Sequence, residues 1–338
     1  MRKLDRNTIS SLAVGFVMAW VPDALAADAL TFGTNWKAQA EHGGFYQAVA
    51  TGLYRDKGLD VTIRQGGPQV NHAQLLAAGR VDLNMGGNLF GQFNFTQNKV
   101  PVVTIAAIFQ KEPQVLLAHP DVKSFEDLRG KTLFIGNDGQ LTFWLWMKQQ
   151  FGFTDSQVKP YTFNPAPFLA DRNSAQQGYV TSEPFAIETQ GGFKPTVLMM
   201  ADAGYDTYST TIEATTALVK EKPDAVQRFV DATIEGWVSY LYGDPSPANA
   251  LIKKDNPDMT DEQLAFSVQT MKDYGIVDSG DALTHGIGAM TDARWRSFYD
   301  KSVGWALYPA DLPVAEMYTL QFGNKGVGLD LKKKLTGG

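Results

Sequence analysis

Aromatic and neutral polar side chains recur where the predicted strands of this sequence end, and together they could bind a flat, uncharged or weakly charged ring. The faces of such a ring stack on aromatic side chains, while its edge nitrogens and oxygens need amide partners. Each of these residues could instead lie in the hydrophobic core, and the sequence leaves that alternative open. The set comprises Asn35, Trp36, Gln65, Asn88, Phe90, Phe109, Gln110, Trp144 and Tyr205.

Charged candidates stand beside this set. His42 precedes a predicted helix, where the positive end of the dipole disfavours an imidazolium, so we expect a neutral donor or acceptor at the ligand or its gate. Glu183 opens another predicted helix, and its carboxylate could accept hydrogen bonds from a ligand amine, with Asp138 and Asp202 as rivals. A glutamate in a first helical turn also complements the dipole without any further role.

Patterns for metal, cofactor or catalytic chemistry are weak. The four histidines are scattered, there is no cysteine, and neither a GxSxG elbow nor a nucleotide-binding glycine fingerprint occurs. Glycine pairs at 43–44, 66–67 and 86–87 could hold an anion on backbone N–H groups, although they equally permit tight turns. We therefore predict no metal, no cofactor and no catalytic residue, and we keep anion binding as an alternative.

The elements that must position these residues alternate between strand and helix. The stretch 41–61 reads as ligand loop, helix and strand after a first strand at 30–34. Such alternation implies a largely parallel sheet with ligands at the carboxyl ends of its strands. A second predicted ligand loop lies at 137–140, and a long helix covers 222–242. Further strands are expected at 59–64, 81–85, 100–109, 115–118, 132–135, 178–182, 195–200 and 215–219.

Length and composition indicate two α/β lobes joined by a hinge. The chain has 338 residues, 44% of them hydrophobic, which is enough for two cores. Its net charge of −6 argues against a nucleic-acid partner. Residues 1–26 read as a signal peptide with cleavage after Ala26, and no later stretch is a membrane candidate. We expect lobe 1 at 27–112, lobe 2 at 113–211, and a return to lobe 1 with C-terminal helices at 212–338.

The start of the chain carries a resemblance. Asn35-Trp36, His42, a helix opening at 43–46, and then 52–54 and 58–61 resemble the first strand and helix of periplasmic solute-binding proteins, within the branch that binds thiamine pyrimidine precursors, sulfonates, nitrate and riboflavin. The resemblance runs from about residue 30 to about 204. It implies a type II periplasmic binding protein whose two lobes close on a ligand, and it implies ligand contact for Trp36.

The function expected from this resemblance is solute capture for an ABC importer, with a permease and an ATPase as partners and the periplasm as location. We expect a monomer that binds an aminopyrimidine related to a thiamine precursor. A flavin, a sulfonate or a nitrate-type anion is the alternative ligand, and a periplasmic ligand sensor is the alternative role. A fungal pyrimidine synthase shares the resemblance, but its histidine and lysine have no counterpart between Arg80 and Lys99, and its cysteines are absent. We therefore predict that the protein is not an enzyme.

Overall fold

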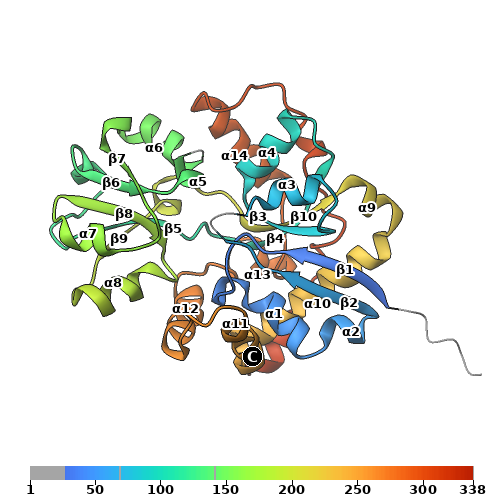
Figure 1. Ribbon diagram of the computed structural model, residues 1–338. Helices are drawn as coiled ribbons and strands as arrows, with labels where there is room; N and C mark the ends of the chain where they lie inside the picture. The colour runs from blue at the N-terminus through green and yellow to red at the C-terminus, as the bar shows by residue number, and fades with distance from the viewer. Residues whose placement is uncertain (1–26, 68–69, 141, 338) are drawn as a thin grey trace, which may run out of the picture.

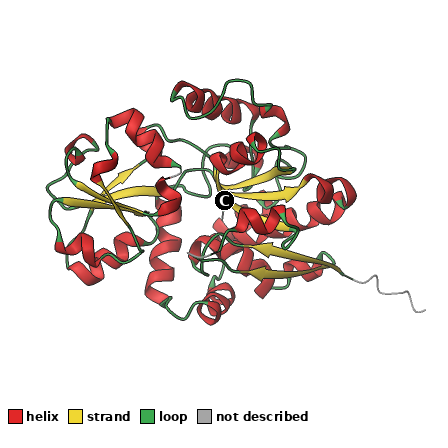
Figure 2. Cartoon of the chain, turned by 45° about the horizontal axis from the view of Figure 1, so that its top comes forward, coloured by secondary structure: helices red, strands yellow, loops and turns green. Residues whose placement is uncertain are grey.

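The computed structural model describes residues 27–67, 70–140 and 142–337, which form two α/β lobes lying side by side (Figure 1). The predicted signal segment, residues 1–26, lies outside the described residues. Each lobe is built on its own five-stranded sheet, and helices surround both sheets (Figure 2).

The sheet of lobe 1 has the strand order β2-β1-β3-β10-β4. β1 runs parallel to β2 and β3, whereas β10 runs antiparallel to both β3 and β4. The strands are β1 (Asp28–Gly33), β2 (Leu59–Arg64), β3 (Leu83–Asn88), β4 (Val102–Phe109) and β10 (Ser209–Thr215).

The sheet of lobe 2 has the order β7-β6-β8-β5-β9. β6 runs parallel to β7 and β8, and β5 runs antiparallel to β8 and β9. The strands are β5 (Gln114–Ala118), β6 (Thr132–Ile135), β7 (Val158–Pro160), β8 (Ser174–Tyr179) and β9 (Thr196–Met199).

Both sheets are therefore mixed. In each sheet four strands run in one direction, as expected for a largely parallel sheet, and one strand, β10 or β5, runs against its neighbours. The reason lies in how the chain passes between the lobes. It crosses once between β4 and β5 and again between β9 and β10. Each strand that enters a lobe starts where its neighbours end: Gln114 of β5 pairs with Tyr179 at the end of β8, and Ser209 of β10 pairs with Phe109 at the end of β4.

A long helix, α10 (Pro223–Tyr242), packs along α1 (Gly43–Ala50) beneath the sheet of lobe 1 (Figure 1). A side chain at Gly43 would collide with Tyr240 and one at Gly44 with Trp237, so this close approach requires glycine. The other helices of lobe 1 are α2 (Leu53–Asp56), α3 (His72–Ala77), α4 (Leu89–Gln97), α9 (Thr216–Glu221), α11 (Ser246–Asp255), α12 (Asp261–Asp273), α13 (Ala282–His285), α14 (Asp292–Gly304) and α15 (Leu329–Thr336).

Lobe 2 carries four short helices around its sheet. They are α5 (Asn137–Gln140), α6 (Phe143–Phe151), α7 (Ala166–Ala170) and α8 (Glu183–Gly191). Single 3₁₀ turns occur in both lobes and in the crossing segment, at η1 (Ala40–His42), η2 (Glu126–Leu128), η3 (Asp155–Gln157), η4 (Ala201–Ala203) and η5 (Val314–Glu316).

Three predicted elements need correction. The strand expected at 215–219 is instead α9, because the Thr215 hydroxyl accepts a hydrogen bond from Leu218 N and caps a helix. The single helix expected within the stretch 41–61 divides into α1 and α2, since Gly52 adopts a left-handed φ of 82°. The strand expected at 178–182 is β8, which ends at Tyr179, so Thr181 lies in the turn before α8.

One contact between the lobes is an aromatic cluster, which we call the aromatic interface. Trp146 of α6 lies with its ring centroid 5.0 Å from that of Tyr205 and 6.2 Å from that of Trp305, which follows α14. Phe90 and Phe298 complete it, 5.7 and 5.6 Å from Tyr205. The cluster packs α6 of lobe 2 against helices of lobe 1.

Candidate functional site

The turn after β1 presents Trp36 at the carboxyl end of that strand. The Trp36 carbonyl accepts hydrogen bonds from the Thr34 hydroxyl at 2.9 Å and from Gly66 N at 3.0 Å. Gln65 also holds this turn: its Oε1 accepts from Ala38 N and its Nε2 donates to the Asp255 carbonyl, both at 2.9 Å. The Gln65 amide is thus engaged by the backbone, while the half-buried Trp36 ring makes no hydrogen bond within the described residues.

Trp36 meets lobe 2 through Phe163. The two ring centroids are 4.5 Å apart at an interplanar angle of 50°, and the ring centroid of Tyr161 lies 5.0 Å from that of Phe163. The Phe163 ring also lies beside Gly136, the residue after β6. The second ligand loop predicted at 137–140 is wrong, because these residues form the short helix α5. The turn after β1 and the end of β6 nevertheless come together at a pair of aromatic rings, one from each lobe.

Two carboxylates from opposite lobes lie in the same region. The Thr181 hydroxyl donates to the Glu41 carboxylate of η1, and Ser267 of α12 donates to the Thr181 carbonyl at 2.6 Å. Glu183 begins α8, and its carboxylate accepts from Tyr179 N at 2.7 Å. The ionised forms of Glu41 and Glu183 repel each other, and the charge of Glu183 also acts on Tyr161. We call Trp36, Phe163, Glu41, Thr181 and Glu183 the interlobe site.

Neither carboxylate has a cationic partner among the described residues. Burial raises the pKa of Glu41, although its bond from Thr181 opposes the rise. For Glu183, burial is again the largest cause, the Glu41 charge adds to it, and the pKa reaches about 7. Part of the Glu183 residue is accessible, but its carboxylate is surrounded by protein. The interlobe site can therefore hold a proton near neutral pH.

His42 follows Glu41 in the sequence and is the last residue of η1. It is fully buried. Its Nε2 lies 3.4 Å from Asn35 Oδ1, and its Nδ1 has no hydrogen-bond partner among the described residues. Burial first, and nearby His72 second, lower its pKa to about 3, so the ring is neutral. A neutral His42 ring was expected from the helix dipole. In the structure, desolvation by burial is the largest cause of its low pKa.

Asn88, Tyr205 and Glu112 form a hydrogen-bonded group where the chain crosses between lobes. Asn88 Oδ1 caps α4 by accepting from Phe90 N at 3.1 Å, and its Nδ2 donates to the Tyr205 hydroxyl at 3.3 Å and to Glu112 at 3.5 Å. Burial raises the pKa of Glu112 to about 8. These bonds order the crossing segments, and the described structure gives Asn88 and Tyr205 partners without a ligand.

Three further predicted residues pack in hydrophobic cores. Phe109 lies 5.7 Å from Trp237, Phe90 belongs to the aromatic interface, and Trp144 stacks on Phe153 while donating from Nε1 to Asp155 at 2.8 Å. All three are at least 98% buried. The Asp138 side chain lies outside the described structure. Ligand contact stays a prediction for all the residues named from the sequence.

The sequence argument missed Glu41, Phe163 and Thr181. Glu41 lies next to His42, but a glutamate before a helix is ordinary and gave no separate signal. Phe163 stands in a polar loop before Asn164-Pro165, where one aromatic residue has no periodicity to mark it. All three acquire interest only from contacts across the lobes, which no local pattern encodes.

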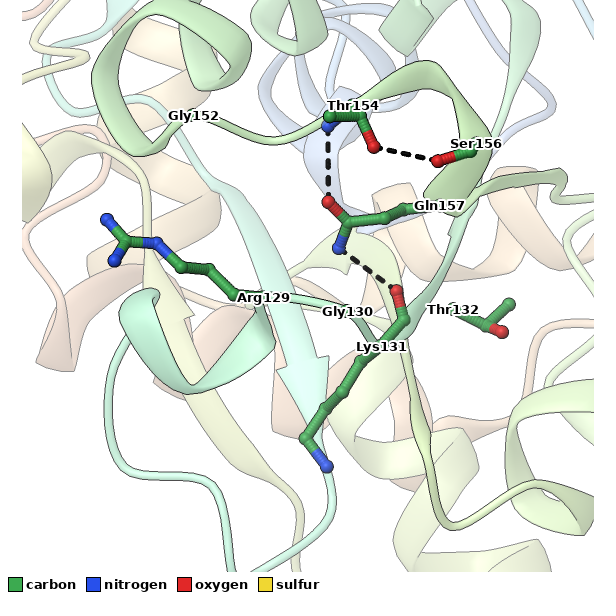
Figure 3. A pocket seen from close by; sticks show the side chains of 8 residues that line it. All are labelled: Arg129, Gly130, Lys131, Thr132, Gly152, Thr154, Ser156 and Gln157. Atoms are coloured by element: carbon green, nitrogen blue, oxygen red, sulfur yellow. Dashed lines mark hydrogen bonds between the residues drawn. The ribbon is translucent and has the colours of Figure 1, made fainter.

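A surface pocket of about 380 Å³ lies in lobe 2, away from this region (Figure 3). Its walls precede β6 and β7, so it opens at the amino ends of these strands, opposite to Gly136. Gln157 fixes its two loops by accepting from Thr154 N and donating to the Lys131 carbonyl, each at 3.1 Å. The lining residues are Arg129, Gly130, Lys131, Thr132, Gly152, Thr154, Ser156 and Gln157, and none of them was a predicted ligand contact.

Two searches of the described residues complete this account of the site. No cluster of three or more His, Asp or Glu side chains suited to a metal ion occurs among them. None of the helices they form is both long and apolar enough to span a bilayer.

Two α/β lobes connected by two crossings, with aromatic and polar side chains meeting between them, define the class of periplasmic binding proteins. Solved structures of this class share the fold. The alkanesulfonate-binding protein SsuA from Xanthomonas axonopodis pv. citri, bound to MOPS, superposes with a TM-score of 0.63 over 88% of this chain and 99% of SsuA, at 14% identity.

The family is shown by the sequence itself. The family model described as NMT1/THI5 like matches residues 39–248, more than half of the chain, and the protein belongs to this family. The riboflavin-binding protein RibY of Chloroflexus aurantiacus is 23% identical over 308 residues, covering 87% of this chain and 85% of RibY. A 4-amino-5-hydroxymethyl-2-methylpyrimidine phosphate synthase of Aspergillus parasiticus is 23% identical over 121 residues, covering 35% of each protein.

These comparisons confirm the predicted fold and the resemblance to this branch of binding proteins. The two binding proteins match most of the chain, whereas the enzyme matches about a third of it. The family and these solute-binding relatives agree with the prediction that the protein is not an enzyme.

Proposed function

We propose that this protein binds a small nitrogen heterocycle of the aminopyrimidine type at the interlobe site and delivers it to an ABC importer. The observation that carries the proposal is the pair of buried carboxylates, Glu41 and Glu183, contributed by opposite lobes. Tyr161 connects them to the ring pair of Trp36 and Phe163, because the Glu183 charge acts on Tyr161 and its ring lies 5.0 Å from that of Phe163. A ring with N–H donors on its edge matches both features. Its faces stack on aromatic side chains, and its edge amine donates to a carboxylate.

The raised pKa of Glu183 strengthens this match. With a pKa of about 7, the carboxyl group can share a proton with a ring nitrogen while its second oxygen accepts from the exocyclic amine. Such a two-point contact requires a ring nitrogen and an amine bonded to the same carbon of the ligand, as in a 4-aminopyrimidine. The unpartnered Nδ1 of buried His42 is a further acceptor beside Glu41 in the sequence.

The same carboxylates disfavour a sulfonate or nitrate-type ligand. Two like charges 4 Å apart repel by about 4 kcal/mol at an effective dielectric constant near 20. In the described part of the chain no lysine or arginine pairs with Glu41 or Glu183 to offset that repulsion. An anion would therefore be accommodated only if both carboxyl groups were protonated.

A flavin is the second candidate, favoured by the likeness to RibY over most of the chain. Its ring system also offers flat faces and an N–H group, so the stacking and hydrogen-bonding argument applies to it equally. The two candidates differ in size, because a flavin needs space for three fused rings between the lobes.

We include in this proposal that the protein works in the periplasm and delivers its ligand to a permease and the associated ATPase. The family and the binding-protein fold support this part. A sensor that presents its ligand to a receptor would use the same site. Uptake of labelled ligand into cells carrying or lacking this protein separates the two, since a sensor would leave uptake unchanged.

Titration calorimetry with three ligands tests the binding proposal. The ligands are 4-amino-5-hydroxymethyl-2-methylpyrimidine, riboflavin and MOPS. We expect binding of the pyrimidine and none of the sulfonate at pH 7. Binding of MOPS alone would refute the proposal, and binding of riboflavin alone would establish the second candidate.

A further inference from the structure

We propose that Phe163 forms the second wall of an aromatic clamp, so that a flat ligand ring inserts between Trp36 of lobe 1 and Phe163 of lobe 2. This inference rests on the proposed function and assigns the ring-binding position within it. Trp36 was a predicted ligand contact, whereas no sequence pattern singled out Phe163.

Phe163 has an unusual environment for its residue type. Its side chain is 44% exposed, and it is the only exposed phenylalanine among those in the described part of the chain. Phenylalanine is ordinarily a core residue. Its ring contacts are with Trp36 across the lobes and with Tyr161 in its own lobe, where burial and the charge of Glu183 raise the Tyr161 pKa. Tyr161 therefore lies between Phe163 and the charge of Glu183.

The backbone of Phe163 is strained. Its φ of 61° lies in the left-handed region, which is unfavourable for a bulky side chain, and glycine or asparagine would normally occupy such a position. Strain of this kind persists where the surrounding structure requires a side chain in one place, and it concentrates at ligand clamps. Here the strained conformation brings the Phe163 ring against Trp36.

The spacing of the two rings indicates what a ligand must do. At 4.5 Å between centroids, no third ring fits between Trp36 and Phe163. Stacked carbon atoms lie about 3.5 Å apart, so a sandwiched ring needs roughly 7 Å between the two walls. Ligand entry must therefore separate the rings by about 2.5 Å, and it exchanges one ring contact for two. Because the walls belong to different lobes, the ligand would connect the lobes directly.

Binding measurements on Phe163 variants test this clamp. Removal of one stacking wall should weaken binding of 4-amino-5-hydroxymethyl-2-methylpyrimidine by roughly ten-fold, the scale of one lost ring–aromatic contact. We expect this loss for both Phe163→Ala and Phe163→Gly, whereas Phe163→Tyr, which keeps the ring, should bind within about two-fold of wild type. Tyr274→Leu is the matched control, since Tyr274 is 39% exposed and outside the interlobe site.

Thermal unfolding of the same variants separates the ring from the strain. Glycine tolerates the left-handed backbone and alanine does not, so Phe163→Gly should unfold at a higher temperature than Phe163→Ala while both bind equally weakly. A binding loss that followed stability, with Phe163→Gly restored to wild-type affinity, would show a structural role and overturn the clamp.

The outcomes distinguish the clamp from the proposed function. If wild type binds the pyrimidine or riboflavin and all Phe163 variants bind equally well, the clamp is wrong and the proposed function stands. If wild type binds neither ring ligand, the proposed function fails and the clamp fails with it.

Discussion

Two of the regions in which the lobes touch differ in chemistry. The aromatic interface around Trp146 and Tyr205 is tightly packed. Glu112 at its edge is hydrogen-bonded by Asn88 and Gln114 N, and burial raises its pKa, as it does that of Glu183. The interlobe site combines an exposed ring with two carboxylates whose ionised forms are desolvated and repel each other. Packed rings stabilise the fold. Two carboxylates that repel each other cost stability, and such costs are commonly retained where a ligand binds.

A substitution at Trp146 is the most direct test of this difference between the two regions. Its side chain is fully buried, so Trp146→Ala should lower the free energy of unfolding by about 3–5 kcal/mol, the scale for deleting a large core side chain. Chemical denaturation measures this. Trp36→Ala, at the half-buried ring of the interlobe site, should lose much less stability. Equal losses at the two positions would remove the distinction between the regions.

Glu183 provides the largest expected effect on ligand binding. Glu183→Gln should weaken binding of the aminopyrimidine by about 1.5–3 kcal/mol, the scale for a charged hydrogen bond, and should leave unchanged or improve binding of a sulfonate. Calorimetry with both ligand classes measures the two effects. Glu188→Gln on the same helix is the control, because Glu188 is exposed. A variant that binds the pyrimidine as tightly as wild type would exclude Glu183 from the site.

Trp36 should show the next largest effect on affinity. Loss of one aromatic wall in Trp36→Ala should weaken ligand binding by about 1–3 kcal/mol, and Trp36 fluorescence should respond to ligand in the wild type. Trp305→Ala is the matched control, a half-buried tryptophan of the aromatic interface. If both variants lose affinity equally, the effect is a general response of the lobes and not a stacking contact.

The last expected effect is that of pH on stability, and it concerns Glu213. This residue lies inside the sheet of lobe 1, where its carboxylate accepts a hydrogen bond from Asn84 at 3.0 Å. Burial raises its pKa from 4.5 to about 7, so the folded state holds this proton more tightly than the unfolded state. The free energy of unfolding should therefore fall as pH rises from 4.5 to about 7 and level off above. Glu213→Gln should reduce that fall by up to about 3 kcal/mol, because one pKa unit corresponds to about 1.4 kcal/mol. An unchanged pH profile would show that Glu213 ionises normally.

The parts of the fold that depend on local patterns could be predicted from the sequence. The strand at Thr132–Ile135 and the Asn71 cap of α3 follow from hydrophobic runs and capping chemistry. The direction of β5 and β10 could not be predicted, because it depends on where the chain enters each lobe. The β-branched residues around Thr215 also predicted a strand, whereas Thr215 caps a helix there.

The candidate site was only partly predictable for the same reason. Trp36 and Glu183 follow strands and could be placed at strand ends. Phe163 and Glu41 gain their interest from contacts across the lobes, with Trp36 and Thr181 respectively. Those contacts depend on how two separately folded sheets dock, and the docking is not encoded in any short stretch of sequence.

The central claim is that two desolvated carboxylates and a pair of rings select a nitrogen heterocycle over an oxyanion. A native mass spectrum of the protein purified from its own host tests this directly, because it reports the mass of whatever ligand is retained. The account predicts a neutral or cationic nitrogen heterocycle, released when Glu183→Gln is introduced. A bound sulfonate or nitrate-type anion would contradict it.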